Sequence, residues 1–160
     1  MTDQLIVVEY GNPYVANSFP TMGANRLAVL ARTWEQVHVF DGESHFTVQP
    51  RETPSFSFLT KFLAHTIYNP SVSLEFEWHR HAEYRKSDLV ELVEQGLQHD
   101  DDIIQQWFGA DDVLALLNSA SSWEQLLIAV RAICGDHEVD TVVRQYVAKV
   151  LKDRRKPSRN

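Results

Sequence analysis

VSLEFEWHRHAEYRKSDLVELVEQGL, residues 72–97, contains the change of period that decides the fold class. Over 72–84, apolar and polar side chains alternate, which predicts a long strand with one buried face. We expect Phe76 and Trp78 to lie on that buried face. From Ser87 onward, apolar residues recur every three or four positions, which is typical of an amphipathic helix. The chain therefore changes from strands to helices within this stretch.

The residues before this stretch are mostly predicted to form strands. LIVVEY, residues 5–10, is a continuous apolar run of the kind found in a well-buried strand. The pair Asp41-Gly42 separates two β-rich runs and indicates a hairpin, because glycine adopts a positive φ without steric cost. Three further segments are predicted to be a loop, a strand (with a short helix as the alternative) and a helix, in that order: 11–25, 26–32 and 54–68.

The residues after the stretch predict several helices. Ser121-Ser-Trp-Glu124 is a capping box that opens one of them, and Gly135 closes it. We expect Asp136 to cap the last helix. The order of elements predicts an α+β fold with a small, mostly antiparallel sheet and one packed helix, followed by a C-terminal helical bundle.

This order also predicts how the chain is divided. A β-rich half over 1–86 and a helical half over 87–153 are expected to share one core, because no linker-like sequence separates them. Residues 154–160 are basic, lack apolar partners and are predicted to be a flexible tail.

Composition limits the class of protein. A chain of 160 residues that is 44% hydrophobic can bury a substantial core. No apolar run approaches the roughly 20 residues of a membrane helix, so no membrane partner is predicted. The start of the chain has no basic stretch before its apolar run, which predicts a cytoplasmic protein without a secretory signal. The single cysteine, Cys134, excludes an internal disulfide and is expected to be buried near a helix end.

Charge is distributed unevenly along the chain. The net charge is −7, yet residues 149–160 are strongly basic and residues 87–130 contain no lysine or arginine. An acidic surface attracts basic partners and repels nucleic acid. We therefore predict a non-enzymatic binding or regulatory protein whose acidic helical surface, 87–130, contacts a basic protein partner. The sequence leaves the oligomeric state open.

Two groups of residues are the predicted contacts. The acidic contacts form two clusters: Asp100, Asp101, Asp102, Asp111 and Asp112. The same acids also suit helix N-termini, where they offset the helix dipole, and this is the competing interpretation. A second contact is predicted in the apolar loop 11–25, at Tyr14, Phe19 and Met22.

A histidine-rich face gives an alternative function. Glu77, His79, His81 and Glu83 share one face of the predicted strand. Two imidazoles two residues apart on a strand are separated by about 7 Å, and a carboxylate completes a mixed metal site. This arrangement predicts a small metal- or histidine-dependent enzyme; the competing interpretation is a solvated strand face.

The metal alternative requires a third ligand. His38 or His45 supplies it if the predicted hairpin pairs with the histidine-bearing strand. Neither a phosphate-binding glycine loop nor a nucleophile elbow is present in the sequence, and no cofactor is predicted.

Overall fold

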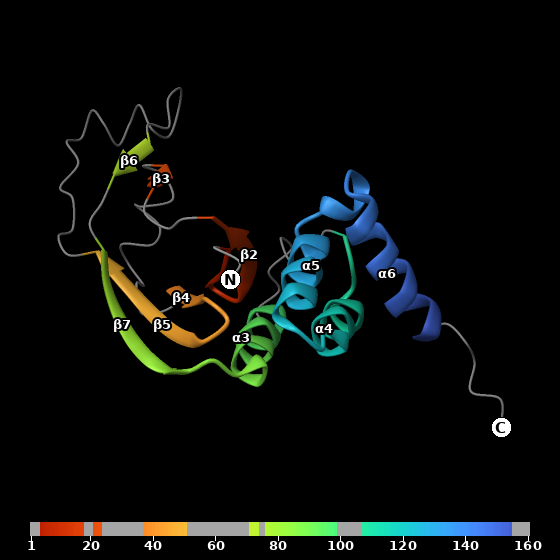
Figure 1. The fold of residues 1–160 in the computed structure, drawn as a ribbon, viewed down its shortest axis with the longest axis horizontal. Coiled ribbons are helices and arrows are strands. Elements are labelled where there is room, and N and C mark those ends of the chain that lie inside the picture. The colour runs from red at the N-terminus through yellow and green to blue at the C-terminus, as the bar shows by residue number, and fades with distance from the viewer. Residues whose placement is uncertain are drawn as a thin grey trace.

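The computed structural model describes residues 4–17, 21–23, 37–50, 71–73, 76–98 and 107–154. Five antiparallel strands form a sheet in the order β2-β1-β4-β5-β7 (Figure 1). Their bounds are Leu5–Glu9 (β1), Asn12–Ala16 (β2), Val37–Phe40 (β4), Ser44–Pro50 (β5) and Phe76–Glu83 (β7). Two short strands, β3 (Thr21–Gly23) and β6 (Ser71–Ser73), pair with each other in a separate antiparallel ribbon.

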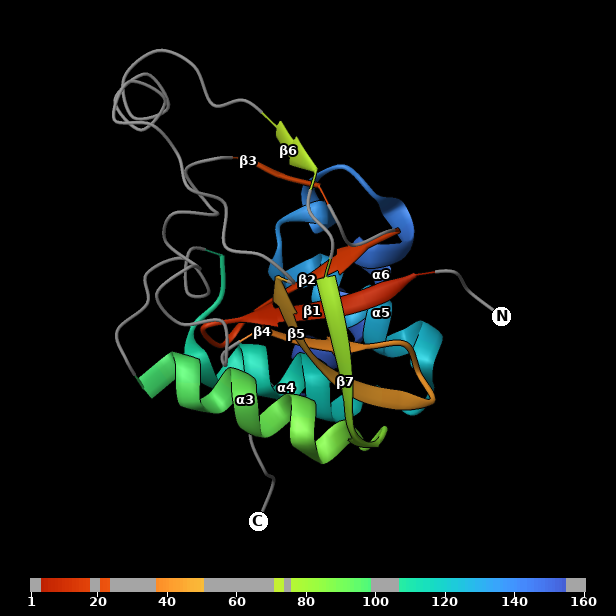
Figure 2. The ribbon, with the colours of Figure 1, turned by 90° about the vertical axis from the view of Figure 1, so that its left-hand side faces the viewer.

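The helices follow the sheet in the sequence and gather on one side of it (Figure 1). In the described part of the chain they are α3 (Lys86–Gln98), α4 (Ala110–Ser119), α5 (Trp123–Ile133), the 3-10 helix η3 (Asp136–Glu138) and α6 (Thr141–Arg154). Helices α3 and α4 run beside each other next to the strands, as Figure 2 shows. The α+β fold with a mostly antiparallel sheet and a C-terminal helical bundle is confirmed.

Two buried clusters cover the two faces of the sheet. Ile6 and Val8 of β1 belong to the larger cluster, which contains the inner faces of α3, α4 and α5. Val7 points the other way, into a smaller cluster with Val39 and Val48. The prediction of a well-buried strand over 5–10 is confirmed, because Ile6, Val7 and Val8 are all fully buried.

The predicted loop 11–25 is wrong in part, because it contains β2 and β3. A tight turn joins β1 to β2 with Tyr10 at φ 52 and Gly11 at φ 81. Positive φ at both central residues matches the twist of a two-residue hairpin, although Tyr10 is an unusual residue there. Pro13 also made a strand improbable from sequence; it is accommodated because β2 is an end strand of the described sheet.

The contact between Gly11 and Gly96 fixes α3 against the sheet. A methyl group built on Gly96 lies 2.6 Å from the Cα of Gly11 and 3.1 Å from the carbonyl oxygen of Tyr10. These are backbone atoms, which have no flexible end to move aside. Glycine at both positions therefore lets the helix lie directly on the first turn.

The predicted strand 72–84 contains β6 and β7, which pair in separate sheets, and its predicted buried face is wrong at Trp78. The side chain of Trp78 is 41% exposed. Its ring meets the edge of Phe46 at 5.6 Å between ring centroids, at the last strand of the described sheet. The segments predicted at 26–32 and 54–68 lie outside the described residues.

Helix caps differ from the predictions by a few residues. Ser122, not Ser121, is the N-cap of α5, and its hydroxyl accepts a hydrogen bond from the backbone N–H of Gln125. Asp140, not Asp136, caps α6 by accepting from the N–H groups of Val142 and Val143. Asp136 instead opens η3, which sequence patterns did not separate from α6. Gly135 ends α5 at φ 98, as predicted.

Candidate functional site

The predicted metal ligands lie on the exposed part of β7. The side chains of Glu77, His79, His81 and Glu83 are all exposed. His79 approaches Glu77, with 3.8 Å between its Nε2 and a carboxylate oxygen. A solvent-exposed pair of this kind contributes little to stability.

The register of the sheet brings two more histidines to this strand. β5 pairs with β7, and a bulge between His45 and Phe46 leaves His81 between two paired positions. The ring of His81 then meets that of His45 edge-on, at 5.0 Å between centroids. His45 in turn lies 2.8 Å from His38, measured from its Nε2 to the Nδ1 of His38. We call His38, His45 and His81 the histidine cluster.

His45 is the buried centre of the histidine cluster. It is 4% exposed, and its ring stacks on Phe40 at 4.3 Å. Phe40 belongs to the larger core, so the cluster lies on the helix-facing side of the sheet. The Nδ1 of His45 is buried and has no hydrogen-bond partner among the described residues. Pairing of the predicted hairpin with the histidine-bearing strand allowed either His38 or His45 as the third ligand, and the register of the sheet identifies His45 as the one that contacts His81.

Burial controls the charge of this cluster. It lowers the pKa of His38 to about 4, with smaller contributions from His45 and His81, since a second positive charge nearby is unfavourable. Burial also lowers the pKa of His45, assisted by His81 and opposed by Asp88 of α3. The His38–His45 pair is therefore neutral at pH 7.

The cluster does not form a metal centre in this arrangement. Within the described ranges, no group of three or more histidine, cysteine, aspartate or glutamate side chains is placed to hold a metal ion. The facing nitrogens of His38 and His45 hydrogen-bond to each other, which occupies one nitrogen of each ring. The alternative enzyme around His79 and His81 stays a prediction without support from these residues.

The predicted acidic contacts are only partly described. Asp100, Asp101 and Asp102 lie outside the described residues. Asp111 is exposed and Asp112 half-buried, and both lie in the first turn of α4. The N-cap of that helix is Gly109, so the two acids act on the helix dipole from inside the first turn.

The predicted loop contacts are separated between strands. Tyr14 lies in β2, and its hydroxyl donates a 2.6 Å hydrogen bond to Glu9. Met22 lies in β3, opposite Val72 of β6. Phe19 lies outside the described residues. These positions do not test whether the three side chains form one contact.

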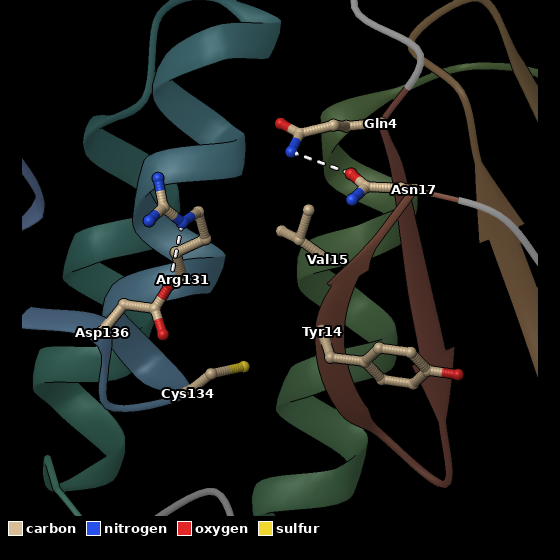
Figure 3. Close-up of a pocket in the computed structure, with 7 residues that line it drawn as sticks. All are labelled: Gln4, Tyr14, Val15, Asn17, Arg131, Cys134 and Asp136. Carbon is tan, nitrogen blue, oxygen red and sulfur yellow. Dashed lines mark hydrogen bonds and ion pairs between the residues drawn. The ribbon is translucent and has the colours of Figure 1, made fainter. Parts of the chain in front are cut away.

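A small pocket separates β2 from the end of α5 (Figure 3). Its volume is about 230 Å³, below the roughly 300 Å³ at which small-molecule sites begin. Arg131 lines it, but its guanidinium is held by two 2.8 Å contacts, to Asp136 and Asp140. Figure 3 shows the sulfur of Cys134 pointing toward β2, whereas the ring of Tyr14 points away from α5.

Cys134 differs from its prediction as a buried apolar residue, because it is exposed at the C-cap of α5. Its Sγ lies 3.3 Å from the carbonyl oxygen of Pro13. The atoms packed around the thiol, together with the charge of Asp136, raise its pKa to about 11. The thiol is therefore protonated at neutral pH, and this pocket holds no activated nucleophile.

Comparison of the chain with protein-family models, curated proteins and solved structures finds no match. No helix in the described part of the chain is long and apolar enough to span a bilayer.

Proposed function

We propose that this chain is a non-enzymatic binding protein that uses the acidic surface of residues 87–130 to contact a basic segment of a protein partner. The observation that carries the proposal concerns Lys86 and Arg131, the two cations immediately before and after this region. Both are already engaged within the chain, so neither neutralises the acids between them.

The first flanking cation is Lys86, at the start of α3. Its Nζ donates to the carbonyl oxygens of Asn118 and Ala120, each at 2.8 Å. These carbonyls lie at the C-terminal end of α4, where a cation is favoured by the helix dipole. Lys86 therefore joins α3 to α4 and does not screen the acids further along α3.

The second flanking cation is Arg131, near the end of α5. It binds Asp136 and Asp140, both of which lie outside the acidic segment. One of these, Asp140, also caps α6. The guanidinium is therefore held at the junction of α5, η3 and α6.

Helix α3 shows how the acidic charge is presented. Leu89, Val93 and Leu97 are buried against the core. Glu91 and Glu94, between them, are exposed on the opposite side. This separation of apolar and acidic residues gives the helix, from residue 87 to residue 98, a solvent face whose charges are all negative, because no lysine or arginine follows Lys86 in α3.

The chemistry of this face favours a basic protein segment. Lysine and arginine side chains gain Coulomb energy from several carboxylates at once, and the attraction reaches about 8 Å at physiological salt. Nucleic acid phosphates are repelled by the same charges. Such a surface accelerates encounter and selects partners by charge more than it adds affinity.

A site-specific photo-crosslinker tests the location of the contact. Gln95 lies on the exposed side of α3, and Gln145 lies on the exposed side of α6, so these two glutamines form a matched pair. We expect a crosslinker at Gln95 to trap a partner from a lysate of the source cells, through a lysine- or arginine-rich segment. The proposal is wrong if only Gln145 yields a product, or if the trapped segment is acidic.

A further inference from the structure

The histidine cluster is the feature of the molecule that the proposed function does not use. Its members come from three strands: His38 from β4, His45 from β5 and His81 from β7. His45 is buried between the ring of Phe40 and the other two imidazoles. A buried, titratable group at the junction of three strands links the protonation of the chain to the packing of its sheet.

The His38–His45 pair disfavours a positive charge because its four ring nitrogens can place only two protons without leaving a buried N–H unpaired. The hydrogen bond between the Nδ1 of His38 and the Nε2 of His45 contains one proton. In the neutral pair, the second proton resides on the Nε2 of His38, and the Nδ1 of His45 carries only its lone pair. This is the arrangement that leaves no buried N–H without an acceptor.

A third proton always creates a buried, unpaired N–H. If His45 takes the charge, both of its nitrogens carry protons. If His38 takes it, His38 donates to the Nε2 of His45, and neutral His45 must carry its own proton on Nδ1. In either case that proton lies at the Nδ1 of His45, where the described residues offer no acceptor. The cost combines an unsatisfied donor with a buried charge.

The groups that face this pair have opposing effects. His81 on β7 adds a further positive charge when it is protonated, which disfavours a charged His38 or His45. Asp88, in the first turn of α3, favours a charged His45. Tyr84 lies edge-on to Phe40 at 6.2 Å, and burial raises its pKa to about 12, so it stays neutral.

We propose that the His38–His45 pair is an acid-sensitive latch that holds β4 and β5 against β7 and α3 at neutral pH and releases them when the pair takes up a proton. Release means that the ring of His45 leaves its stacked position on Phe40 and finds water for its Nδ1. The change therefore loosens the sheet locally, on the face next to the start of α3.

The direction of the pH dependence follows from the lowered pKa values. Between about pH 4 and pH 6.5 the unfolded chain binds protons at these histidines more readily than the folded chain. The stability that the neutral pair contributes is thus fully present above about pH 6.5 and is lost as the pH falls toward 4. A change from pH 7 to pH 5 should raise the unfolding constant about tenfold through this pair.

Urea unfolding of the full chain at pH 7 and pH 5 tests the latch with a matched set of variants. His45→Phe keeps a ring on Phe40 and removes the proton site, and His38→Gln removes the partner. His79→Gln is the control, because His79 is an exposed histidine on β7 outside the cluster. We expect the tenfold change in the wild type and the control, and a clearly smaller change in His45→Phe and His38→Gln. Equal changes in all four proteins would overturn the proposal.

Nitrogen NMR of the wild-type imidazoles keeps the test independent of whether the variants fold. The latch requires that the Nδ1 of His45 has the chemical shift of an unprotonated nitrogen at pH 7. It also requires that His38 stays neutral at pH 6 and that the pKa of His45 lies below that of a free histidine. Rings that titrate like those of a free peptide, or a proton on the Nδ1 of His45 at pH 7, would refute it.

Discussion

Replacement of Gly96 by alanine tests the packing that places α3, and with it both the acidic surface and Asp88. The added methyl carbon would lie 2.6 Å from the Cα of Gly11 and 3.0 Å from its carbonyl carbon. A Cβ built on Gly11 would in turn lie 2.3 Å from the Cα of Gly96, so the two backbones touch directly and neither has a flexible side chain at the contact that could move aside. Helix α3 must therefore move away from the turn by about 1 Å to reach an ordinary carbon–carbon contact.

The cost of that movement exceeds the gain in helix propensity. Overpacking of a rigid contact costs about 3 kcal/mol at the upper end of the usual range, whereas alanine gains about 1 kcal/mol over glycine inside a helix. We expect Gly96→Ala to lower the free energy of unfolding by about 2 kcal/mol, which corresponds to roughly 5 °C in melting temperature for a domain of this size.

Urea unfolding followed by circular dichroism measures this change. Gly109→Ala is the matched control, because no atom lies within 4 Å of a Cβ at Gly109. Its expected cost is a few tenths of a kcal/mol, from the weaker N-cap that alanine makes. If Gly96→Ala is as stable as the wild type or more stable, the close contact between α3 and the first turn is refuted.

Three further predictions concern the cap of α5, the histidines and the cysteine. Ser122→Ala should lower the free energy of unfolding by about 1 kcal/mol and Ser121→Ala by clearly less, because Ser122 accepts from the N–H of Gln125; equal losses in thermal unfolding would contradict this. Because burial lowers the pKa of His38 to about 4, the free energy of unfolding should fall between pH 7 and pH 5 by about 1.4 kcal/mol more in the wild type than in His38→Gln, after allowance for solvent screening. Urea unfolding measures both proteins, and an equal fall in the two would refute the prediction. Since the pKa of Cys134 is raised to about 11, its alkylation by iodoacetamide at pH 8 should be about a hundredfold slower in the folded chain than in urea; equal rates would contradict the packing around its sulfur.

Local chemistry made much of the fold predictable. Asp41-Gly42 forms its hairpin because Gly42 adopts φ 93 and the carboxylate of Asp41 accepts from the N–H groups of Glu43 and Ser44. The change of period near residue 85 also holds, since β7 ends at Glu83 and α3 begins at Lys86. Each of these signals depends on residues that are adjacent in the sequence.

The features that were missed depend on contacts between distant segments. The turn at Tyr10-Gly11 lacks the usual asparagine or aspartate, and the contact with Gly96 that requires glycine there comes from another element. Trp78 alternates like a core residue, but a strand at the end of the described sheet leaves it partly exposed.

The candidate site could likewise be predicted from the sequence only in part. Sequence alternation places His79 and His81 on a polar strand face. The bulge at His45, which brings His45 against His81, is a property of the paired strands. The engagement of Lys86 by the end of α4 is likewise a contact over 32 residues, which no local pattern encodes.

Salt and charge reversal test whether the acids of α3 bind a basic partner. The most direct measurement is the dissociation constant of the partner segment trapped at Gln95, at 50 and 300 mM salt, for the wild type, Glu91→Lys and Glu138→Lys. Glu91 and Glu138 are both exposed, and the two variants change the net charge equally. We expect that added salt weakens binding, that Glu91→Lys weakens it about tenfold at low salt, and that Glu138→Lys leaves it nearly unchanged. Equal dissociation constants for the three proteins at both salt concentrations would contradict it.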